Sequence, residues 1–364
     1  MLALLLLVVF CASRGAAEAE EFDCERQPRT EGGPPGAEAV RPADVRAVAA
    51  LGDSISAGFG MRANTGLWVD DAVEFRGLAF STGGDSERSL SSLLEAVRPL
   101  KEKPLAGKAR GTTLPLDFFT FRKHVLRRHS PDTDKFNAAM SGSYVGDIAD
   151  KQTPYLVEQM QDHPWLDFYN DWKLITFETG SNNVLDACLD RPWSHPENFE
   201  VELESALRDL HSRIPNVFVN LMPIVNISAV HPVFENHFFC RAVQELVRDA
   251  GCAALGTHDD LVKLERVRVA FNSIIYSVAN RLNSELSGPR SNFTISVQPF
   301  MEDLELRNVL EVSGFDCFHP SERAHNVMAQ GLWNNMLQAP GNKSRQVDRH
   351  NPTYLCPQET TVLR

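Results

Sequence analysis

The stretch that decides the fold is residues 48–58, VAALGDSISAG, in which small and branched apolar residues run directly into Gly-Asp-Ser. The apolar half is typical of a buried strand, and the Gly, Asp and Ser residues are typical of the turn that ends one. Most such turns carry no chemistry, so Ser54 alone is weak evidence for a nucleophile. A nucleophilic serine also needs a base, an acid that orients the base, and donors for an oxyanion.

Strand patterns alternate with helical patterns along the rest of the chain. Strands are expected at residues 45–53, 135–142, 172–180, 216–224 and 293–301. Amphipathic periodicity predicts helices at 147–163, 197–214, about 234–250, 259–286 and 320–338, the last one capped by Ser321. This alternation predicts an α/β fold in one domain, with a mainly parallel sheet covered on both faces.

Ligands of parallel sheets bind outside the carboxyl ends of the strands. Three of the expected strands end on polar turns that contain glycine, Gly52-Asp53-Ser54, Ser141-Gly142 and Gly180-Ser181-Asn182. In a parallel sheet these three turns converge on one edge. The sequence therefore predicts a site at that edge.

A second candidate element is the stretch FDCFHPSERAH, residues 315–325, which places Asp316 and His319 three residues apart. This spacing lets the carboxylate bond to one ring nitrogen while the other nitrogen takes the proton of a serine. The pair alone is weak evidence, because Asp and His often share surface turns. Combined with the three glycine turns, it predicts a serine hydrolase site.

The N-terminal segment is typical of an exported protein, and the net charge argues against nucleic acid as its main partner. The formal net charge of −12 argues against nucleic acid or an anionic membrane surface as the main partner. Residues 2–12 are apolar but too short to cross a bilayer, and small residues follow, so residues 1–17 are interpreted as a secretory signal peptide. The alternative is an N-terminal membrane anchor. With the signal removed, we expect a secreted or lumenal chain without a transmembrane anchor.

Cysteines and glycosylation sequons agree with export. Of the 7 cysteines, Cys11 leaves with the signal and 7 − 1 = 6 remain, an even number that favours disulfides and allows fifteen pairings. The six are Cys24, Cys188, Cys240, Cys252, Cys317 and Cys356. Sequons predict glycans at Asn226, Asn292 and Asn342. The sequence has no zinc-ligand cluster and no phosphate-binding glycine loop, so we expect neither a metal nor a cofactor.

Ser54, Gly142, Asn182 and the Asp316/His319 pair follow the order of the four sequence blocks of the GDSL, or SGNH, hydrolases, which the chain resembles. Within that family it resembles the animal phospholipase B group, from about Phe22 to Cys356. The segments that carry this resemblance are VRPADVRAVAALGDSISAG (40–58), FRGLAFSTGGD (75–85), DWKLITFETGSNN (171–183), SVQPF (296–300), DCFHPSERAH (316–325) and LWNNMLQAPG (332–341). It implies an SGNH-hydrolase-like three-layer α/β/α fold with a central sheet of about five strands.

The resemblance also implies a role for each residue. Ser54 is the expected nucleophile, His319 the general base and then acid, and Asp316 the residue that orients His319. The backbone N–H groups of Ser54 and Gly142 and the side chain of Asn182 are the expected oxyanion hole. Asp53 is interpreted as a structural turn residue. One position departs from the group, since Asn183 stands where the group usually has Asp.

The implied function is a secreted serine acyl-ester hydrolase that releases fatty acids from glycerophospholipids and lysophospholipids, without a metal. Two alternatives stay open: a short-chain or carbohydrate esterase, and a non-catalytic secreted protein that binds a lipid or glycan on the same fold. A fluorophosphonate probe that labels Ser54 separates the enzyme from the binding protein.

The remaining expectations concern the segments around the 45–340 domain. Residues 18–44 are an exposed lead-in, and residues 83–113 are a long surface excursion. The apolar residues of that excursion, Leu90, Leu93, Leu94 and Val97, either fold over the site to meet acyl chains or pack onto the body of the domain. Residues 341–364 are a tail that a disulfide is expected to tie down.

The phospholipase B group carries cysteines at the positions of Cys317 and Cys356, which implies a bond between them. The next expected pair is Cys24–Cys188, which leaves Cys240–Cys252. That last pair is difficult, because twelve residues of unbroken helix separate two cysteines by roughly 18 Å, beyond disulfide reach. Either the helix breaks near Gly251, or the pairing is different.

Overall fold

The computed structural model describes residues 22–62, 73–85, 89–99, 129–246, 252, 257–286, 290–349 and 353–364. The expected signal peptide lies outside these residues. The sheet has the strand order β1 (Val45–Gly52), β2 (Trp172–Glu178), β3 (Val217–Met222) and β4 (Phe293–Val297), and each neighbouring pair is parallel. Every residue of β2 and β3 is buried, as in sheets that are covered on both faces. The predicted α/β fold with a parallel sheet is confirmed.

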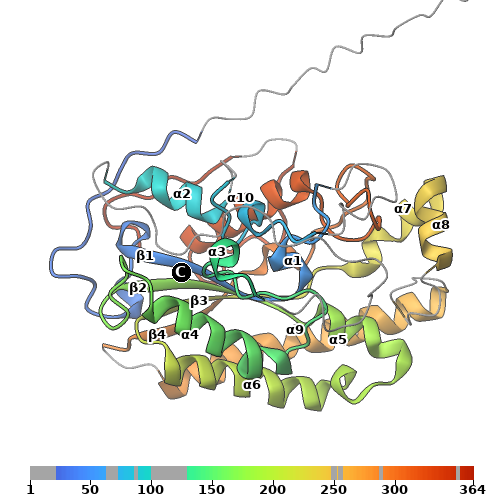
Figure 1. Ribbon diagram of the computed structural model, residues 1–364, viewed down its shortest axis with the longest axis horizontal. Helices are drawn as coiled ribbons and strands as arrows, with labels where there is room; N and C mark the ends of the chain where they lie inside the picture. The colour runs from blue at the N-terminus through green and yellow to red at the C-terminus, as the bar shows by residue number, and fades with distance from the viewer. Residues whose placement is uncertain are drawn as a thin grey trace, which may run out of the picture.

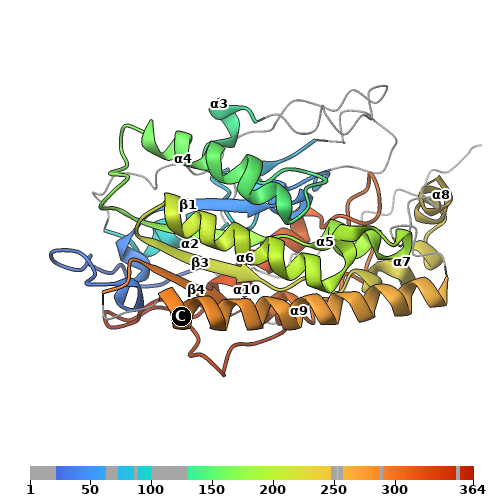
Figure 2. The same ribbon diagram turned by 90° about the horizontal axis from the view of Figure 1, so that it is seen from below.

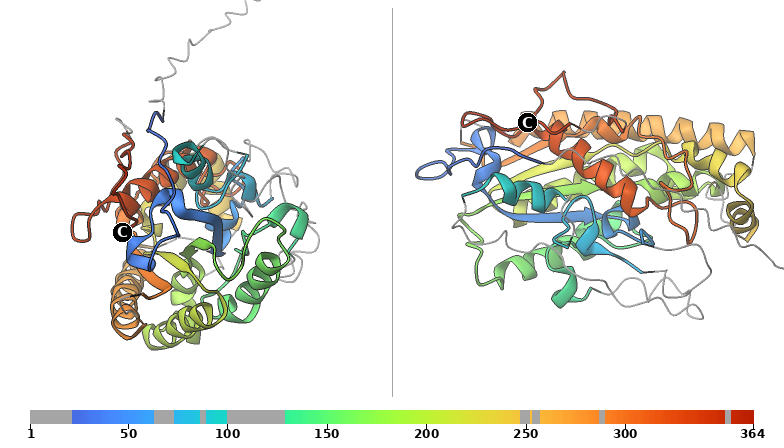
Figure 3. Two further views of the ribbon diagram at one scale, coloured as in Figure 1. Left: turned by 90° about the vertical axis from the view of Figure 1, so that its left-hand side faces the viewer. Right: turned by 90° about the horizontal axis from the view of Figure 1, so that it is seen from above.

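Helices cover both faces of this sheet (Figure 1). One face is covered by α4 (Thr153–Gln161), α6 (Pro196–Arg213) and α9 (His258–Leu286), which lie in front of the strands in Figure 2. The other face is covered by α2 (Leu90–Val97) and α10 (Glu322–Leu337), as the right-hand view of Figure 3 shows. The shorter helices are α1 (Ser54–Ala57), α3 (Pro131–Asp134), α5 (Ser181–Leu185), α7 (His231–Asn236) and α8 (Phe238–Leu246). Among the described residues, no helix is both long and apolar enough to cross a membrane.

The strand expected at 135–142 is replaced by an extended segment at the edge of the sheet. It runs beside β1 and forms one isolated parallel bridge, between Ala50 and Asn137. Three backbone hydrogen bonds join it to β1, and the Met140 amide donates to the Gly52 carbonyl at 3.1 Å. The Arg76 guanidinium donates a hydrogen bond to the Asn137 carbonyl at 3.0 Å, on the side where a further strand would pair. The described part of the chain therefore has four named strands, one fewer than expected.

The prediction of a surface excursion is wrong for residues 89–99, because these residues include the core helix α2. Ser89 caps this helix by accepting a hydrogen bond from the Ser92 amide at 3.3 Å. The four apolar residues of the helix face are at most 2% exposed: Leu90, Leu93, Leu94 and Val97. They pack onto the body of the domain and do not fold over the site. Residues 100–113 of the expected excursion lie outside the described residues.

The cysteines form three disulfides, Cys24–Cys356, Cys188–Cys252 and Cys240–Cys317. The three expected pairings are therefore all wrong. Cys317 lies before the first turn of α10, whereas the residue before Cys356 bonds to Asn334 and Trp333 at the other end of that helix. The length of α10 thus separates the two cysteines that were expected to pair. Cys240, on α8, bonds to Cys317, and Cys252 bonds to Cys188.

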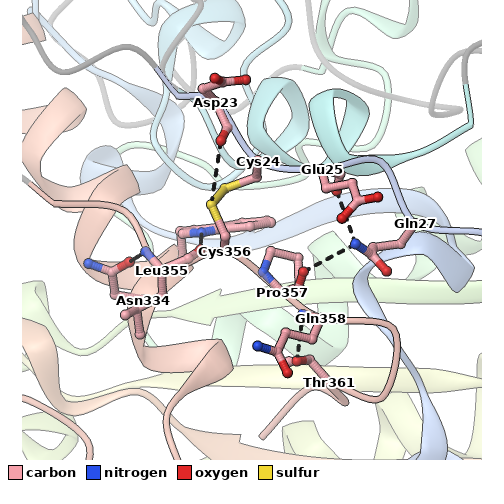
Figure 4. Close-up of a disulfide and its surroundings, with 11 residues drawn as sticks. Asp23, Cys24, Glu25, Gln27, Asn334, Leu355, Cys356, Pro357, Gln358 and Thr361 are labelled. Atoms are coloured by element: carbon pink, nitrogen blue, oxygen red, sulfur yellow. Dashed lines mark hydrogen bonds between the residues drawn. A yellow bond between two sulfur atoms is a disulfide. The ribbon is translucent and has the colours of Figure 1, made fainter.

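The chain beyond α10 is held against the N-terminal segment, as Figure 4 shows. Beside the Cys24–Cys356 bond, the Gln27 side chain donates to the Pro357 carbonyl at 3.2 Å. Further along, the Leu363 amide donates to the Val40 carbonyl at 2.7 Å, just before β1. A disulfide does tie the tail, but it joins the tail to the N-terminal segment and not to the loop that carries Cys317.

Candidate active site

Ser54 is the first residue of α1, immediately after β1. The strand ends at Gly52, and Asp53 caps the helix by accepting a hydrogen bond from the Ile55 amide at 3.0 Å. The helix ends after one turn at Gly58, whose φ of 71° is the left-handed conformation that glycine adopts at little cost. The Ser54 side chain thus stands at the carboxyl edge of the sheet, on the side where α1, α5 and α7 lie in Figure 1.

Ser54, His319 and Asp316 form a continuous hydrogen-bonded chain. The Ser54 hydroxyl donates to Nε2 of His319 at 2.7 Å, and Nδ1 of His319 donates to Oδ2 of Asp316 at 2.5 Å. The other carboxylate oxygen of Asp316 accepts from the amides of Phe318 and His319 at 2.9 and 3.0 Å. The carboxylate therefore holds the ring with its proton on Nδ1, so that Nε2 faces the serine as a base.

The charges of His319 and Asp316 stabilise each other. Burial lowers the pKa of His319, but the Asp316 carboxylate and its hydrogen bond outweigh burial and raise the pKa above its ordinary value. Burial raises the pKa of Asp316, but the His319 charge and three hydrogen bonds outweigh it and hold the pKa below its ordinary value. Asp316 therefore stays ionised and stabilises the imidazolium that forms when His319 takes a proton.

The loop that carries Asp316 and His319 is fixed from two sides. Cys317 lies between them in the chain and is bonded to Cys240 of α8. Ser313 accepts from the Cys317 amide at 2.9 Å, and its own hydroxyl donates to the Gly60 carbonyl at 2.7 Å, beyond α1. The aromatic ring of Phe59 lies edge-on to the His319 ring at 4.8 Å. These contacts set the position of His319 relative to Ser54.

The expected oxyanion donors lie around the same space. Ser54, Gly142 and Asn182 all line one pocket. Gly142 has φ of 75°, and a Cβ built on it meets no atom within 4 Å, so its backbone borders open space. The Asn182 amide donates one hydrogen to the Ser143 carbonyl at 2.9 Å, which orients its second hydrogen. The arrangement can bind the negative oxygen of a tetrahedral intermediate.

A buried ion pair that the sequence motifs do not include holds the Ser141–Gly142 loop. Oε1 of Glu74 accepts from the Ser141 amide at 3.0 Å and from its hydroxyl at 2.6 Å. Glu74 is in turn bound by Arg76 at 2.6 Å, and Arg76 also contacts Asp134 at 3.2 Å. The signal for this network was present in the sequence, because Glu74 and Arg76 are opposite charges two residues apart in an otherwise apolar stretch.

Gln152 is a second residue that the motifs did not single out. Its side chain accepts from the Gly52 amide and donates to the Gly52 carbonyl, both at 2.8 Å, and also donates to the Ser143 hydroxyl at 3.1 Å. One buried amide thus joins the residue that ends β1 to the loop that carries Gly142. Nothing local in the sequence distinguishes this glutamine from others on a helix.

Asn183, which stands where the group usually has Asp, is fully buried. Its oxygen accepts from the Val145 amide at 3.2 Å, and its nitrogen donates to the Trp193 carbonyl at 2.8 Å. A carboxylate cannot make the second bond, because it has no proton to donate. The amide is therefore matched to this site, and it joins the loop after Gly142 to the segment after α5.

The pocket beside Ser54 has a volume of about 280 Å³. Ser54, Gly142, Asn182 and His319 form its polar side. The rest of its wall is mainly apolar and comes from α1, α5, the 225–230 segment, Leu306 and the loop of His319: Ile55, Phe59, Leu185, Val225, Ile227, Val230, Leu306, Phe318 and Pro320. A reacting ester at Ser54 therefore has an apolar wall next to its acyl group.

The three predicted sequons lie in different surroundings. Asn292 and Asn342 are exposed. Asn226 is only partly exposed and lines the pocket beside Ser54, with its Oδ1 accepting from the Ser228 hydroxyl at 2.6 Å. A sugar attached to Asn226 would therefore occupy the pocket beside Ser54.

Known proteins are similar to this chain over most of its length. A family model described as GDSL-like Lipase/Acylhydrolase matches residues 48–332. The membrane-associated phospholipase B1 of Homo sapiens is 29% identical over 355 residues, which cover 94% of this chain and 23% of that protein. The Rattus norvegicus protein of the same name is 31% identical over 342 residues, covering 90% and 22%. The chain thus spans less than a quarter of the length of these relatives.

Among solved structures, an extracellular lipase from Streptomyces rimosus matches with 13% identity and a TM-score of 0.35, covering 76% of this chain and 93% of that one. That likeness is too low to carry an argument. The family match is different, because it includes more than half of the chain and runs from β1 to α10. The chain belongs to the GDSL-like lipase/acylhydrolase family.

Proposed function

We propose that this protein hydrolyses the fatty-acyl esters of glycerophospholipids and lysophospholipids, with Ser54 as nucleophile, His319 as base and acid, and Asp316 as the orienting carboxylate. The observation that carries the proposal is the hydrogen-bonded chain from Ser54 through His319 to Asp316, at 2.7 and 2.5 Å. Ser54 and His319 of this hydrogen-bonded chain line a pocket that combines oxyanion donors with an apolar wall.

In the first half of the reaction the Ser54 oxygen attacks the ester carbonyl while its proton passes to Nε2 of His319. The Ser54 and Gly142 amides and the Asn182 side chain bind the oxyanion. The intermediate then collapses, the bond to the alcohol breaks, and His319 gives its proton to the departing alcohol oxygen. The acyl group remains on Ser54 as an ester.

In the second half a water molecule attacks this ester and gives a proton to His319. The same donors bind the second oxyanion. When the bond between the acyl carbon and Ser54 breaks, the serine oxygen takes the proton back and the fatty acid leaves. The Asp316 carboxylate stays ionised throughout, and each step uses side chains and backbone amides of this chain together with water.

The lipid substrate is supported by the apolar pocket wall and by relatives named phospholipase B1. A lysophospholipid places one acyl ester at the end of an alkyl chain, which matches a polar reaction centre beside an apolar wall. We further infer that the chain is exported, because three disulfides are typical of oxidising compartments. Glycans are then expected on the exposed Asn292 and Asn342.

The test compares the secreted protein with its Ser54→Ala variant on lysophosphatidylcholine, dioleoyl phosphatidylcholine and p-nitrophenyl acetate, in EDTA. We expect turnover of both lipids by the wild type, and a loss of about 10⁶-fold in kcat for the variant, as for other triad serines. Turnover confined to the acetate would make the protein a short-chain esterase. Intact protein that neither turns over an ester nor reacts with a fluorophosphonate would be a binding protein.

A further inference from the structure

Two carboxyl groups are buried under the helix that carries Ser54, and the proposed reaction uses neither. Asp53 is 0% exposed and Glu178 is 2% exposed. Asp53 immediately precedes the nucleophile, and Glu178 is the last residue of β2, where it pairs in register with Gly52. A buried carboxylate without a partner is costly, so both groups need an explanation.

Their contacts place both carboxyls at the start of α1. Oε2 of Glu178 accepts a hydrogen bond from the Ser56 hydroxyl at 3.1 Å. Oδ1 of Asp53 accepts from the Ile55 amide at 3.0 Å. Oδ2 of Asp53 is buried and meets no strict hydrogen bond among the described residues, although the hydroxyl and amide of Ser181 also act on this carboxyl and lower its pKa. A proton on Glu178, whose carboxyl contacts that of Asp53, would supply a further donor.

Burial and the charge of Asp53 favour a proton on Glu178. Burial raises the pKa of Asp53 to about 6, although the Ile55 amide, His319 and Ser181 act in the opposite direction. Burial and then the charge of Asp53 raise the pKa of Glu178 well above its ordinary value, with only the Ser56 hydrogen bonds lowering it. Two adjacent buried carboxyls do not both ionise, and one keeps a proton that they share.

We propose that Glu178 is a positioning residue that keeps a proton at neutral pH and donates it in a hydrogen bond to Asp53. With Ser56 on its other oxygen, Glu178 then holds the first turn of α1 at both Asp53 and Ser56. This turn carries the Ser54 hydroxyl and the Ser54 amide. The inference rests on the proposed function only in taking Ser54 as the nucleophile.

The proton also limits the working pH. When Glu178 loses it, two negative charges face each other under α1, and Ser54 moves out of line with His319. Turnover of the wild type is therefore expected to fall at alkaline pH. The charged groups that act on the pair among the described residues are the two carboxyls themselves and His319, which faces Asp53.

Two variants at this position separate the hydrogen bonds from the proton. In Glu178→Gln the amide donates to Asp53 and accepts from Ser56 but cannot ionise, so kcat at pH 7 should stay within about threefold of the wild type and should persist at alkaline pH. Glu178→Leu removes both contacts and should lose about a hundredfold in kcat, the usual cost of misplacing a reacting group. The matched control is Glu202→Gln on α6, another carboxyl whose pKa is raised by burial, and it should keep the alkaline fall.

Two measurements do not depend on activity. Infrared difference spectra at pH 7 should show a protonated-carboxyl C=O band in the wild type that Glu178→Gln removes and Glu202→Gln keeps. The free energy of unfolding should also decrease as pH rises above the ordinary pKa of Glu, because the native state keeps a proton that the unfolded chain has lost. In Glu178→Gln this decrease should be smaller.

The proposal is overturned if the wild type has no such band, or if Glu178→Gln loses turnover at alkaline pH in step with the wild type. An active Ser54→Ala variant would instead overturn the proposed function. In that case the infrared and unfolding measurements still decide whether Glu178 holds the proton.

Discussion

Replacing Gly142 with alanine tests the oxyanion loop with a change whose cost can be worked out from the backbone. Gly142 has φ of 75°, where a residue with a side chain costs about 1–2 kcal/mol. No clash adds to this, because a Cβ built there meets no atom within 4 Å. The methyl group enters the open space that Gly142 borders, which is the pocket beside Ser54. The substrate carbonyl then cannot approach the Gly142 amide.

Gly341 offers a matched control. Its φ is 85°, a Cβ built there also meets nothing within 4 Å, and it lies in the turn after α10, away from the pocket. Both alanine variants should therefore lose about 1–2 kcal/mol of unfolding free energy. Only Gly142→Ala should lose turnover, by about 10²–10³ in kcat, as when one oxyanion donor is removed.

The assay pairs denaturant unfolding with kcat on lysophosphatidylcholine for the two variants. Equal losses of stability with unequal losses of turnover support the assignment. The reasoning is refuted if Gly142→Ala keeps more than about a tenth of wild-type kcat, since a lost oxyanion donor costs far more. It is also refuted if Gly341→Ala loses as much turnover as Gly142→Ala.

Three further predictions address the triad, the disulfides and the pocket sequon. Asp316→Asn should lower kcat by roughly 10⁴ and move the acid limb of the pH–rate profile to lower pH, because the carboxylate raises the pKa of His319; an unmoved limb would contradict this. Non-reduced peptide mapping should recover Cys240 joined to Cys317, and Cys240→Ser should cost about 2–4 kcal/mol of unfolding free energy; a Cys317–Cys356 peptide would show the pairing to be wrong. Molecules with a sugar on Asn226 should not turn over lipid, and equal activity of fractions separated by glycan occupancy at that site would disprove the prediction.

The sequence predicted the buried strands well, because their signal is local. Residues 172–180, 216–224 and 293–301 each contain a strand of the sheet, and each strand begins within one residue of its expected start. A strand buried on both faces is a short, nearly continuous apolar run, and polar turns bound it clearly. The segment at 135–142 has the same pattern, but Arg76 binds its outer side, and this contact joins residues 61 apart in the chain, beyond the reach of a local pattern.

The polar residues of the site were predictable for a related reason. Ser54, Gly142 and Asn182 each follow an expected strand or edge segment, and parallel geometry brings such positions to one edge. Asp316 and His319 are close in the chain, so their contact is local as well. The disulfides are not local. Their pairing depends on where α8 and the tail pack, and a resemblance in cysteine positions did not supply that information.

Glu178 was missed because its role depends on protonation and packing. Asp53, Glu178 and Asp316 are all carboxyls close to His319 or to its neighbours, yet the environment assigns them different charges. Asp316 accepts two amides and faces a cation, so its pKa is lowered and it serves the imidazolium. Glu178 is buried, faces another carboxyl and, among the described residues, accepts hydrogen bonds from Ser56 alone, so burial and the charge of Asp53 raise its pKa.

The different protonation of these carboxyls affects the pKa of His319. If Glu178 were ionised together with Asp53, their two charges would add to that of Asp316 and would stabilise an imidazolium at His319 even before Ser54 reacts. His319 would then lose its capacity to act as a base at neutral pH. A proton kept on Glu178 leaves Asp53 as the one neighbouring charge that raises the pKa of His319 besides Asp316. The protonated Glu178 under α1 therefore keeps His319 able to accept the proton of Ser54.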